Sequence, residues 1–357
     1  MSFYYEFPAV KGVQAHNEYY ISMVPLKLLS KLFPNDDDVV TPENRAQRRI
    51  NEARIPEIKQ YILENRDTYV FSALSASIDG DFKFISNDKS DIGILKVDMD
   101  SIFLINDGQH RKAAIEAALS EDKSLDNETI SIVFFKDLGL SRSQQMFTDL
   151  NKHAVKTSNS LSTLYNSRDP LAVITRDVID SVSFFKKYTD KERDILGKNS
   201  LNLFTLNNIY KANQIIVHGD VCGAKQQKYL IKFWNTVANN IIEWQEVLNR
   251  QLTKKDLREN YIVTLAVTLN ALGRLGRFFY ENTDYDMELY LSKLKNIDWL
   301  RSNEKNWKGR TINENGKVVN SEGAAILTCN KIKILIGLEL NKEEIIKEKI
   351  VKKWKRC

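Results

Sequence analysis

A five-residue stretch, Asp107–Arg111, brings an acid, an amide, an imidazole and a guanidinium together around one glycine. The apolar run Ile102–Ile105 precedes it and predicts a buried strand, while the alanine-rich run Ala113–Leu119 predicts a helix. Because Gly108 tolerates backbone angles that other residues resist, the chain can turn sharply there. The first turn of a helix presents unpaired N–H groups and a partial positive charge. The stretch therefore predicts an anion-binding turn.

Each polar side chain of this turn has a role that its chemistry suggests. Arg111 can hold phosphate oxygens through two N–H groups, and backbone N–H groups at Gly108 and Gln109 would add donors. His110 can contact phosphate or orient a water molecule, and Asp107 can cap the helix, hold Arg111 or approach a metal ion. We take Asp107, Gln109 and His110 as candidate catalytic residues. The alternative is a plain Asp-Gly turn, and since folding does not require Arg111 we expect its removal to leave stability unchanged.

A second polar stretch, Asp149–His153, follows a predicted helix over Ser143–Leu150. Asp149 and Asn151 offer oxygen ligands for Mg²⁺, an ion that keeps most of its waters and takes one or two side chains. Lys152 and His153 could reach phosphate. The alternative is a polar helix end capped by Asn151, with no ligand.

Two basic segments are candidates for DNA contact. A helix predicted from Thr41 and Pro42 carries four arginines close together on consecutive turns: Arg45, Arg48, Arg49 and Arg54. The end of the chain, Lys342–Cys357, predicts a basic amphipathic helix with candidate contacts at Lys352, Lys353, Lys355 and Arg356. A solvated helix face is the alternative for the first segment, and a partner-binding or plain terminal helix for the second.

Composition excludes several classes of protein. With 43% hydrophobic and 28% charged residues the chain has the profile of an ordinary globular protein, and its net charge of +5 permits nucleic acid as a partner without requiring it. Three widely spaced cysteines with no C-x-x-C pair support neither a zinc site nor a disulfide framework. The sequence contains neither a G-x-S-x-G nor a G-x-x-x-x-G-K-[ST] motif. We expect no secretory leader and no membrane span, and therefore a cytoplasmic protein.

The order of predicted elements indicates an α+β fold in two domains. Strands are predicted within 19–24, 69–78, 102–105 and 130–135, with an amphipathic helix over 55–65. Beyond a polar linker near 155–166 the periodicity is helical, and the nearly all-apolar run 261–280 predicts a central helix. We therefore expect a first domain over residues 1–160 with a small mixed sheet, and an all-helical domain over 161–357 that ends in the basic helix.

The Asp107–Arg111 signature (DGQHR) resembles that of the DndB family of DNA sulfur modification proteins. The likeness extends over roughly residues 45–170, and it includes Arg54–Ile58, Tyr69–Leu74 and Gln144–His153. The DGQHR group in turn resembles the ParB/sulfiredoxin-like fold, in which a Gly-x-x-Arg turn at a helix start binds nucleotide phosphates.

This resemblance implies a DNA-binding regulatory protein of a DNA phosphorothioate modification system, gated by nucleotide binding or hydrolysis at the turn. The implied nucleotide-binding residues are Asp107, Gly108, Gln109, His110, Arg111, Asn151, Lys152 and His153, and the implied cofactor is ATP or CTP with Mg²⁺. Double-stranded DNA and other DNA-modification proteins are the implied partners, and a homo-oligomer is compatible with the sequence. The alternative is a stand-alone ATPase or other nucleotide hydrolase, or a ParB-like nuclease acting on DNA.

Overall fold

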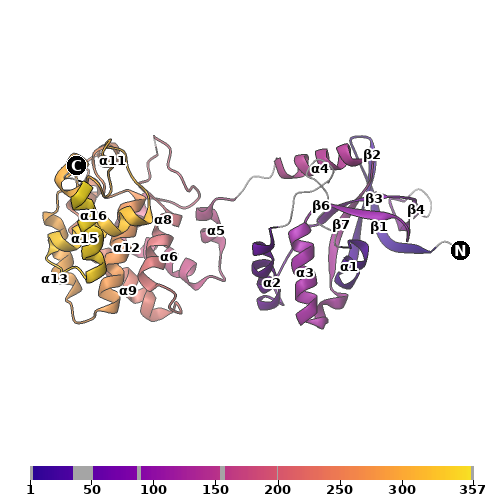
Figure 1. Cartoon of the computed structure of the whole chain (residues 1–357), viewed down its shortest axis with the longest axis horizontal. Helices are drawn as coiled ribbons and strands as arrows, with labels where there is room; N and C mark the ends of the chain where they lie inside the picture. The colour runs from indigo at the N-terminus through magenta and orange to yellow at the C-terminus, as the bar shows by residue number, and fades with distance from the viewer. Residues whose placement is uncertain (1–2, 35–50, 87–89, 153–156, 199, 355–357) are drawn as a thin grey trace. The chain divides into compact units, whose positions relative to one another are not determined.

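The computed structural model describes residues 3–34, 51–86, 90–152, 157–198 and 200–354, without the side chains of 140, 151–152 and 350–354. The chain divides into two compact units, Met1–Val155 and Lys156–Cys357 (Figure 1). Each unit has its own hydrophobic core, the first around the strands and the second among helices. The α+β class expected from the sequence is therefore confirmed.

The described part of the first unit contains one seven-stranded sheet in the order β4-β5-β1-β2-β7-β3-β6. Its strands are β1 (Tyr4–Gln14), β2 (Asn17–Pro25), β3 (Leu74–Asp79), β4 (Phe82–Ser86), β5 (Ile92–Asp98), β6 (Ile102–Asp107) and β7 (Thr129–Lys136). The sheet is mixed because β3 runs parallel to β7, whereas its other pairings are antiparallel. It is larger than the small sheet that the sequence predicted, since β1, β4 and β5 carry no strong pattern.

Helices flank this sheet. They are η1 (Leu26–Leu28), α1 (Leu29–Leu32), η3 (Glu52–Arg54), α2 (Ile55–Glu64), α3 (Gln109–Glu121), η4 (Lys123–Asn127) and α4 (Leu140–Lys152). Helices α2 and α3 lie side by side, and Ile62 of α2 and Ile115 of α3 join the sheet core (Figure 1). Helix α4 packs against β6, which forms one edge of the sheet.

The described part of the second unit consists of helices, their connections, a few isolated bridges and one short parallel strand pair, β8 (Thr189–Asp190) and β9 (Phe204–Thr205). Its helices are α5 (Asn159–Tyr165), α6 (Pro170–Ser181), α7 (Ser183–Tyr188), α8 (Leu206–Val217), α9 (Ala224–Asn240), α10 (Ile242–Leu248), α11 (Lys254–Asn260), α12 (Ala266–Glu281), α13 (Met287–Leu291), η5 (Ser292–Asn296), α14 (Glu304–Trp307), α15 (Glu322–Ile336) and α16 (Lys342–Trp354). Helix α12 packs on both α8 and α15. A Cβ at Gly273 would lie 2.8 Å from the carbonyl oxygen of Ala212, so the close approach of α8 and α12 requires glycine.

Three sequence predictions need correction. The strand predicted over 69–78 begins only at Leu74, and the helix predicted over 261–280 begins at Ala266. The run 102–105 forms the expected strand and buries Phe103 and Ile105 at 6% exposure each, but it lies on the sheet edge, where the side chain of Ile102 is 59% exposed. Edge position depends on pairing partners that a local pattern does not specify. The helix predicted from Thr41 lies largely outside the described residues.

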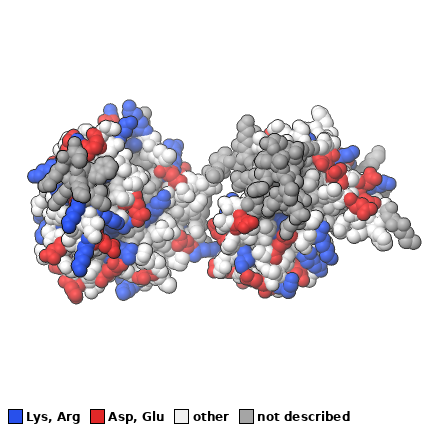
Figure 2. Space-filling view, viewed as in Figure 1, with Lys and Arg blue, Asp and Glu red and all other residues white. Residues whose placement is uncertain are grey.

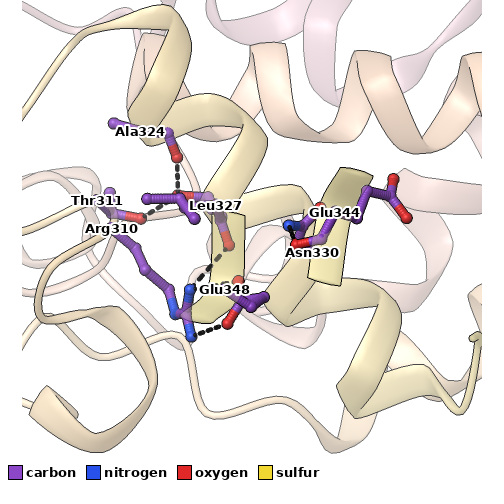
Figure 3. A network of polar contacts seen from close by, with 8 residues as sticks. Arg310, Thr311, Ala324, Leu327, Asn330, Glu344 and Glu348 are labelled. Carbon is purple, nitrogen blue, oxygen red and sulfur yellow. Dashed lines mark hydrogen bonds and ion pairs between the residues drawn. The ribbon is translucent and has the colours of Figure 1, made fainter. Parts of the chain in front are cut away.

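The last helix, α16, is held to the bundle by its acidic residues. The buried Arg310 guanidinium donates to both carboxylate oxygens of Glu348 at 2.7 Å (Figure 3). Lys333 pairs with Glu344 at 2.6 Å. The side chain of Asn330 also donates to the carbonyl of Glu344. The apolar side chains of Ile345 and Ile346 are exposed instead of packed. Over its described side chains, residues 342–349, helix α16 therefore turns carboxylates toward the core.

We expect Glu348→Ala to lower the free energy of unfolding of the helical unit by about 3–5 kcal/mol, because Arg310 would stay buried without its counter-charge. Urea unfolding of the full chain, followed by tryptophan fluorescence, reports on this unit alone because all five tryptophans lie in it. Glu304→Ala is the matched control, since its pair with Lys308 is exposed and should contribute less than about 1 kcal/mol. Equal effects of the two variants would contradict the assignment.

Candidate functional site

The turn between β6 and α3 is built on Gly108. This residue has a φ of +105°, in the left-handed region, and a Cβ there would overlap the side chain of Leu74. It also occupies the N-cap position, so no side chain caps the start of α3. The first N–H groups of the helix, at Gln109 and His110, have no intrahelical acceptor because of helix geometry. The turn thus has the backbone features that the sequence predicted.

Arg111 is held by the protein itself. Its Nη2 donates to Asp107 Oδ2 at 2.6 Å, and its Nη1 donates to the carbonyls of Ser72 at 2.7 Å and Ala73 at 3.0 Å, as well as to the Ser72 hydroxyl. The side chain is only 17% exposed. The guanidinium therefore ties the start of α3 to the segment before β3. Both terminal nitrogens of Arg111 therefore already donate to the protein. The main role of this side chain is to hold the turn in shape, and a phosphate contact would be additional.

The same contacts occupy the backbone carbonyls of Ser72 and Ala73, in the segment 69–73 that forms no strand. Carbonyls that a sheet neighbour would use accept from Arg111 instead. At the other end of the segment the Tyr69 hydroxyl donates to Glu128, which Arg66 also contacts at 2.6 Å. Burial, followed by this hydrogen bond, raises the pKa of Tyr69 to about 12. The segment is thus fixed by side chains at both ends.

A cavity of about 270 Å³ opens at the turn. Residues from the turn, from the start of α2 and from α4 line it: Arg54, Ile58, Asn106, Asp107, Gly108, Gln109, His110, Arg111 and Phe147. Arg54, which the sequence predicts as a DNA contact, is an exposed side chain that lies beside the nucleotide-site candidates, and its DNA contact stays a prediction. Sequence reasoning missed Ile58, Asn106 and Phe147. The sequence offered one signal for them: Asn106 directly precedes the signature, and Phe147 and Ile58 lie in the stretches Gln144–His153 and Arg54–Ile58 that share the family resemblance.

His110 links the turn to the segment that carries Arg54. Its Nε2 accepts the backbone N–H of Asn51 at 3.0 Å, and the Asn51 side chain in turn accepts from Ala53 N–H at the start of η3. These two contacts tie the first turn of α3 to the residues that lead into Arg54.

Asp149, Asn151 and Lys152 of the second polar stretch fall in helix α4, which extends two residues beyond the predicted end at Leu150. The exposed Asp149 accepts from Gln145 at 2.7 Å and is not among the cavity-lining residues. The side chains of Asn151 and Lys152, and all of His153, lie outside the described residues. Within the described ranges no group of three His, Cys, Asp or Glu side chains could hold a metal ion. The Mg²⁺ role of Asp149 and Asn151 stays a prediction.

The remaining DNA-contact candidates cannot be tested against described side chains. Five of them lie outside the described residues: Arg45, Arg48, Arg49, Lys355 and Arg356. Two more, Lys352 and Lys353, belong to α16 but have no described side chains.

A second depression of about 530 Å³ on the first unit is lined by four lysines together with Glu116 and Asp126: Lys27, Lys31, Lys112 and Lys123. Lys112, at 5% exposure, pairs with Glu116 at 2.9 Å. This lysine depression was not predicted.

Among the described residues no helix has the length and apolar character needed to cross a membrane. On the face of each unit seen in Figure 2, basic and acidic side chains are interspersed. Any polyanion contact on this face therefore depends on local clusters and not on a uniformly basic surface.

We expect Arg111→Ala to lower the free energy of unfolding of the first unit by about 2–3 kcal/mol, because it removes several charge-assisted hydrogen bonds. This differs from the expectation from sequence, which was no change in stability. Thermal unfolding followed by far-ultraviolet circular dichroism should show the loss. The tryptophan-fluorescence transition of the helical unit should stay in place. Arg54→Ala, which removes the exposed arginine of the same cavity, should leave both transitions unchanged. An unaltered dichroism transition in Arg111→Ala would contradict a structural role.

Comparison with known proteins places the chain in a family. A family model described as DndB, DNA-sulfur modification-associated, matches residues 7–339. No curated protein and no solved structure gives a significant match, so the ParB/sulfiredoxin-like fold stays a prediction. The family match covers both units and nearly the whole length of 357 residues. The chain therefore belongs to the DndB family of proteins associated with DNA sulfur modification.

Proposed function

We propose that this protein regulates DNA phosphorothioate modification by binding double-stranded DNA, and that a nucleotide bound at the turn Asp107–Arg111 controls this binding. The observation that carries the proposal is the cavity at the uncapped start of α3, which the signature residues line together with Arg54. Family membership supplies the link to DNA sulfur modification. Other DNA-modification proteins are natural partners for such a regulator.

The residues around the cavity suit an anionic nucleotide. The N–H groups of Gln109 and His110 and the partial positive charge of the helix start would meet phosphate oxygens. Arg54 would add a cation at the cavity, and Ile58 and Phe147 offer apolar surface to a sugar or base. Asp107 and Arg111 would hold the turn in shape through their ion pair. In this proposal Asp107, Gln109 and His110 are also the groups nearest to any hydrolysis, with Asn151, Lys152 and His153 as further contacts.

Titration calorimetry of the full chain with ATP, CTP and GTP, with and without Mg²⁺, tests the nucleotide site. We expect at least one nucleotide to bind, and its affinity to change when duplex DNA is present, because linked sites alter each other reciprocally. Arg54→Gln should weaken nucleotide binding about tenfold, the loss of one hydrogen bond to a charged group. Lys305→Gln, at an exposed lysine of the helical unit, is the control. Absence of nucleotide binding under all conditions would refute the gating proposal.

DNA binding should be dominated by phosphate contacts. Gel-shift affinity is expected to fall steeply with salt, and replacing Arg45, Arg48 and Arg49 by glutamine should flatten the slope by about one unit per lost contact. A second triple variant, with glutamine at Lys27, Lys31 and Lys123 of the lysine depression, provides the comparison.

The two triple variants separate two surfaces. A flattened slope in the arginine variant alone supports the contact predicted from sequence. A flattened slope in the lysine variant alone would move the DNA to the depression beside α3 and refute the arginine contact. Binding that does not depend on salt would refute an electrostatic mode altogether.

A further inference from the structure

Asn106, the residue before the signature, is placed by an irregularity in the sheet. Where β3 pairs with β6, Ser75 lies opposite Asp107 and Ala76 lies opposite Ile105, so Asn106 is an extra residue without a partner position. Such a bulge redirects side chains and is frequent beside functional sites. Here it buries Asn106 to 1% exposure on the wall of the cavity at the start of α3.

The amide of Asn106 is half satisfied. Its Nδ2 donates to the Ser77 hydroxyl at 2.7 Å and approaches the Met146 sulfur at 3.2 Å. The amide nitrogen lies on the side of the sulfur, and a thioether can accept a hydrogen bond but cannot donate one. Among the described residues, Asn106 Oδ1 is buried without any hydrogen-bond donor.

A buried acceptor without a donor is unfavourable and rare in native proteins, so it calls for a ligand or a specific water. The groups around Asn106 indicate the chemical class of such a ligand. The uncapped helix start and Arg54 favour an anion, whereas Asn106 Oδ1 accepts a hydrogen bond and therefore favours a ligand that carries a hydroxyl or amino donor. Phosphate or pyrophosphate alone would bind to the helix start and to Arg54, but it would leave Asn106 Oδ1 without a hydrogen-bond donor.

We propose that Asn106 is a specificity-determining residue of this site, and that its Oδ1 selects an anion that also carries a hydroxyl or amino donor, as a nucleotide does. The inference rests on the nucleotide site of the proposed function and adds the selection against simple phosphates. The donor comes from a sugar hydroxyl or from an exocyclic amine of the base. At about 270 Å³ the cavity is slightly smaller than typical ligand pockets of about 300–1,000 Å³, so it encloses part of the nucleotide and leaves the rest outside.

Titration calorimetry of the full chain with four probes tests the selection: ATP, pyrophosphate, 2′,3′-dideoxy-ATP and ITP. We expect the wild type to bind ATP at least about tenfold more tightly than pyrophosphate. Weak binding of the dideoxy compound identifies a sugar hydroxyl as the donor, and weak binding of ITP identifies the amino group. If CTP is the nucleotide that the wild type binds, UTP replaces ITP as the analogue without the amine.

Two variants separate selection from folding. Asn106→Ala should weaken ATP binding about tenfold while pyrophosphate binding changes less than about twofold. Ser77→Ala removes the partner of Nδ2 and keeps Oδ1, so it should disturb the same buried contact and leave the ratio of the two affinities as in the wild type.

The outcomes distinguish this inference from the proposal on which it rests. Equal weakening of ATP and pyrophosphate in Asn106→Ala, or equal binding of all four probes by the wild type, overturns the selection and leaves nucleotide binding intact. Absence of any binding by the wild type overturns both. If Asn106→Ala does not fold, the wild-type comparison of the four probes still decides the question.

Discussion

The arrangement of the candidate site depends on the guanidinium of Arg111. By donating to Asp107 and to the carbonyls of Ser72 and Ala73, it joins the first turn of α3 to the segment that leads into β3. This bridge, together with the left-handed conformation of Gly108, holds the helix start open and uncapped. A charged group with little exposure is stable in such a place only because each of its contacts is an acceptor.

This bridge changes how the signature can act. The residue expected to grip phosphate serves first as a structural tie, and the contacts left for an anion are the backbone N–H groups and Arg54. Asn106 adds a buried acceptor that no described residue satisfies. The signature therefore combines a fixed backbone cradle with side chains from three elements, which is the preorganisation that selective binding requires.

The helical unit shows the same reliance on paired charges. Arg310 and Lys333 hold Glu348 and Glu344 of α16, while Ile345 and Ile346 remain exposed. A buried ion pair costs desolvation and makes the geometry of the contact specific, since each partner is stable only when the other is in place. Helix α16 is therefore attached in one defined orientation, and Lys347 and Lys349 on it are exposed.

The sequence by itself determined the strand, turn and helix around Gly108, the amphipathic helix α2, the helical character of the second half and the family, because these follow from local propensity, periodicity and a short motif. It did not determine the edge position of β6, the bulge at Asn106, the contacts of Arg111 with Ser72 and Ala73 or the inward-facing Glu344 and Glu348 of α16. Each of these is a contact between residues distant in the chain, such as Arg111 with Ser72 or Arg310 with Glu348. Only the tertiary structure decides them, because local patterns specify the period of a segment and not the neighbour against which it packs.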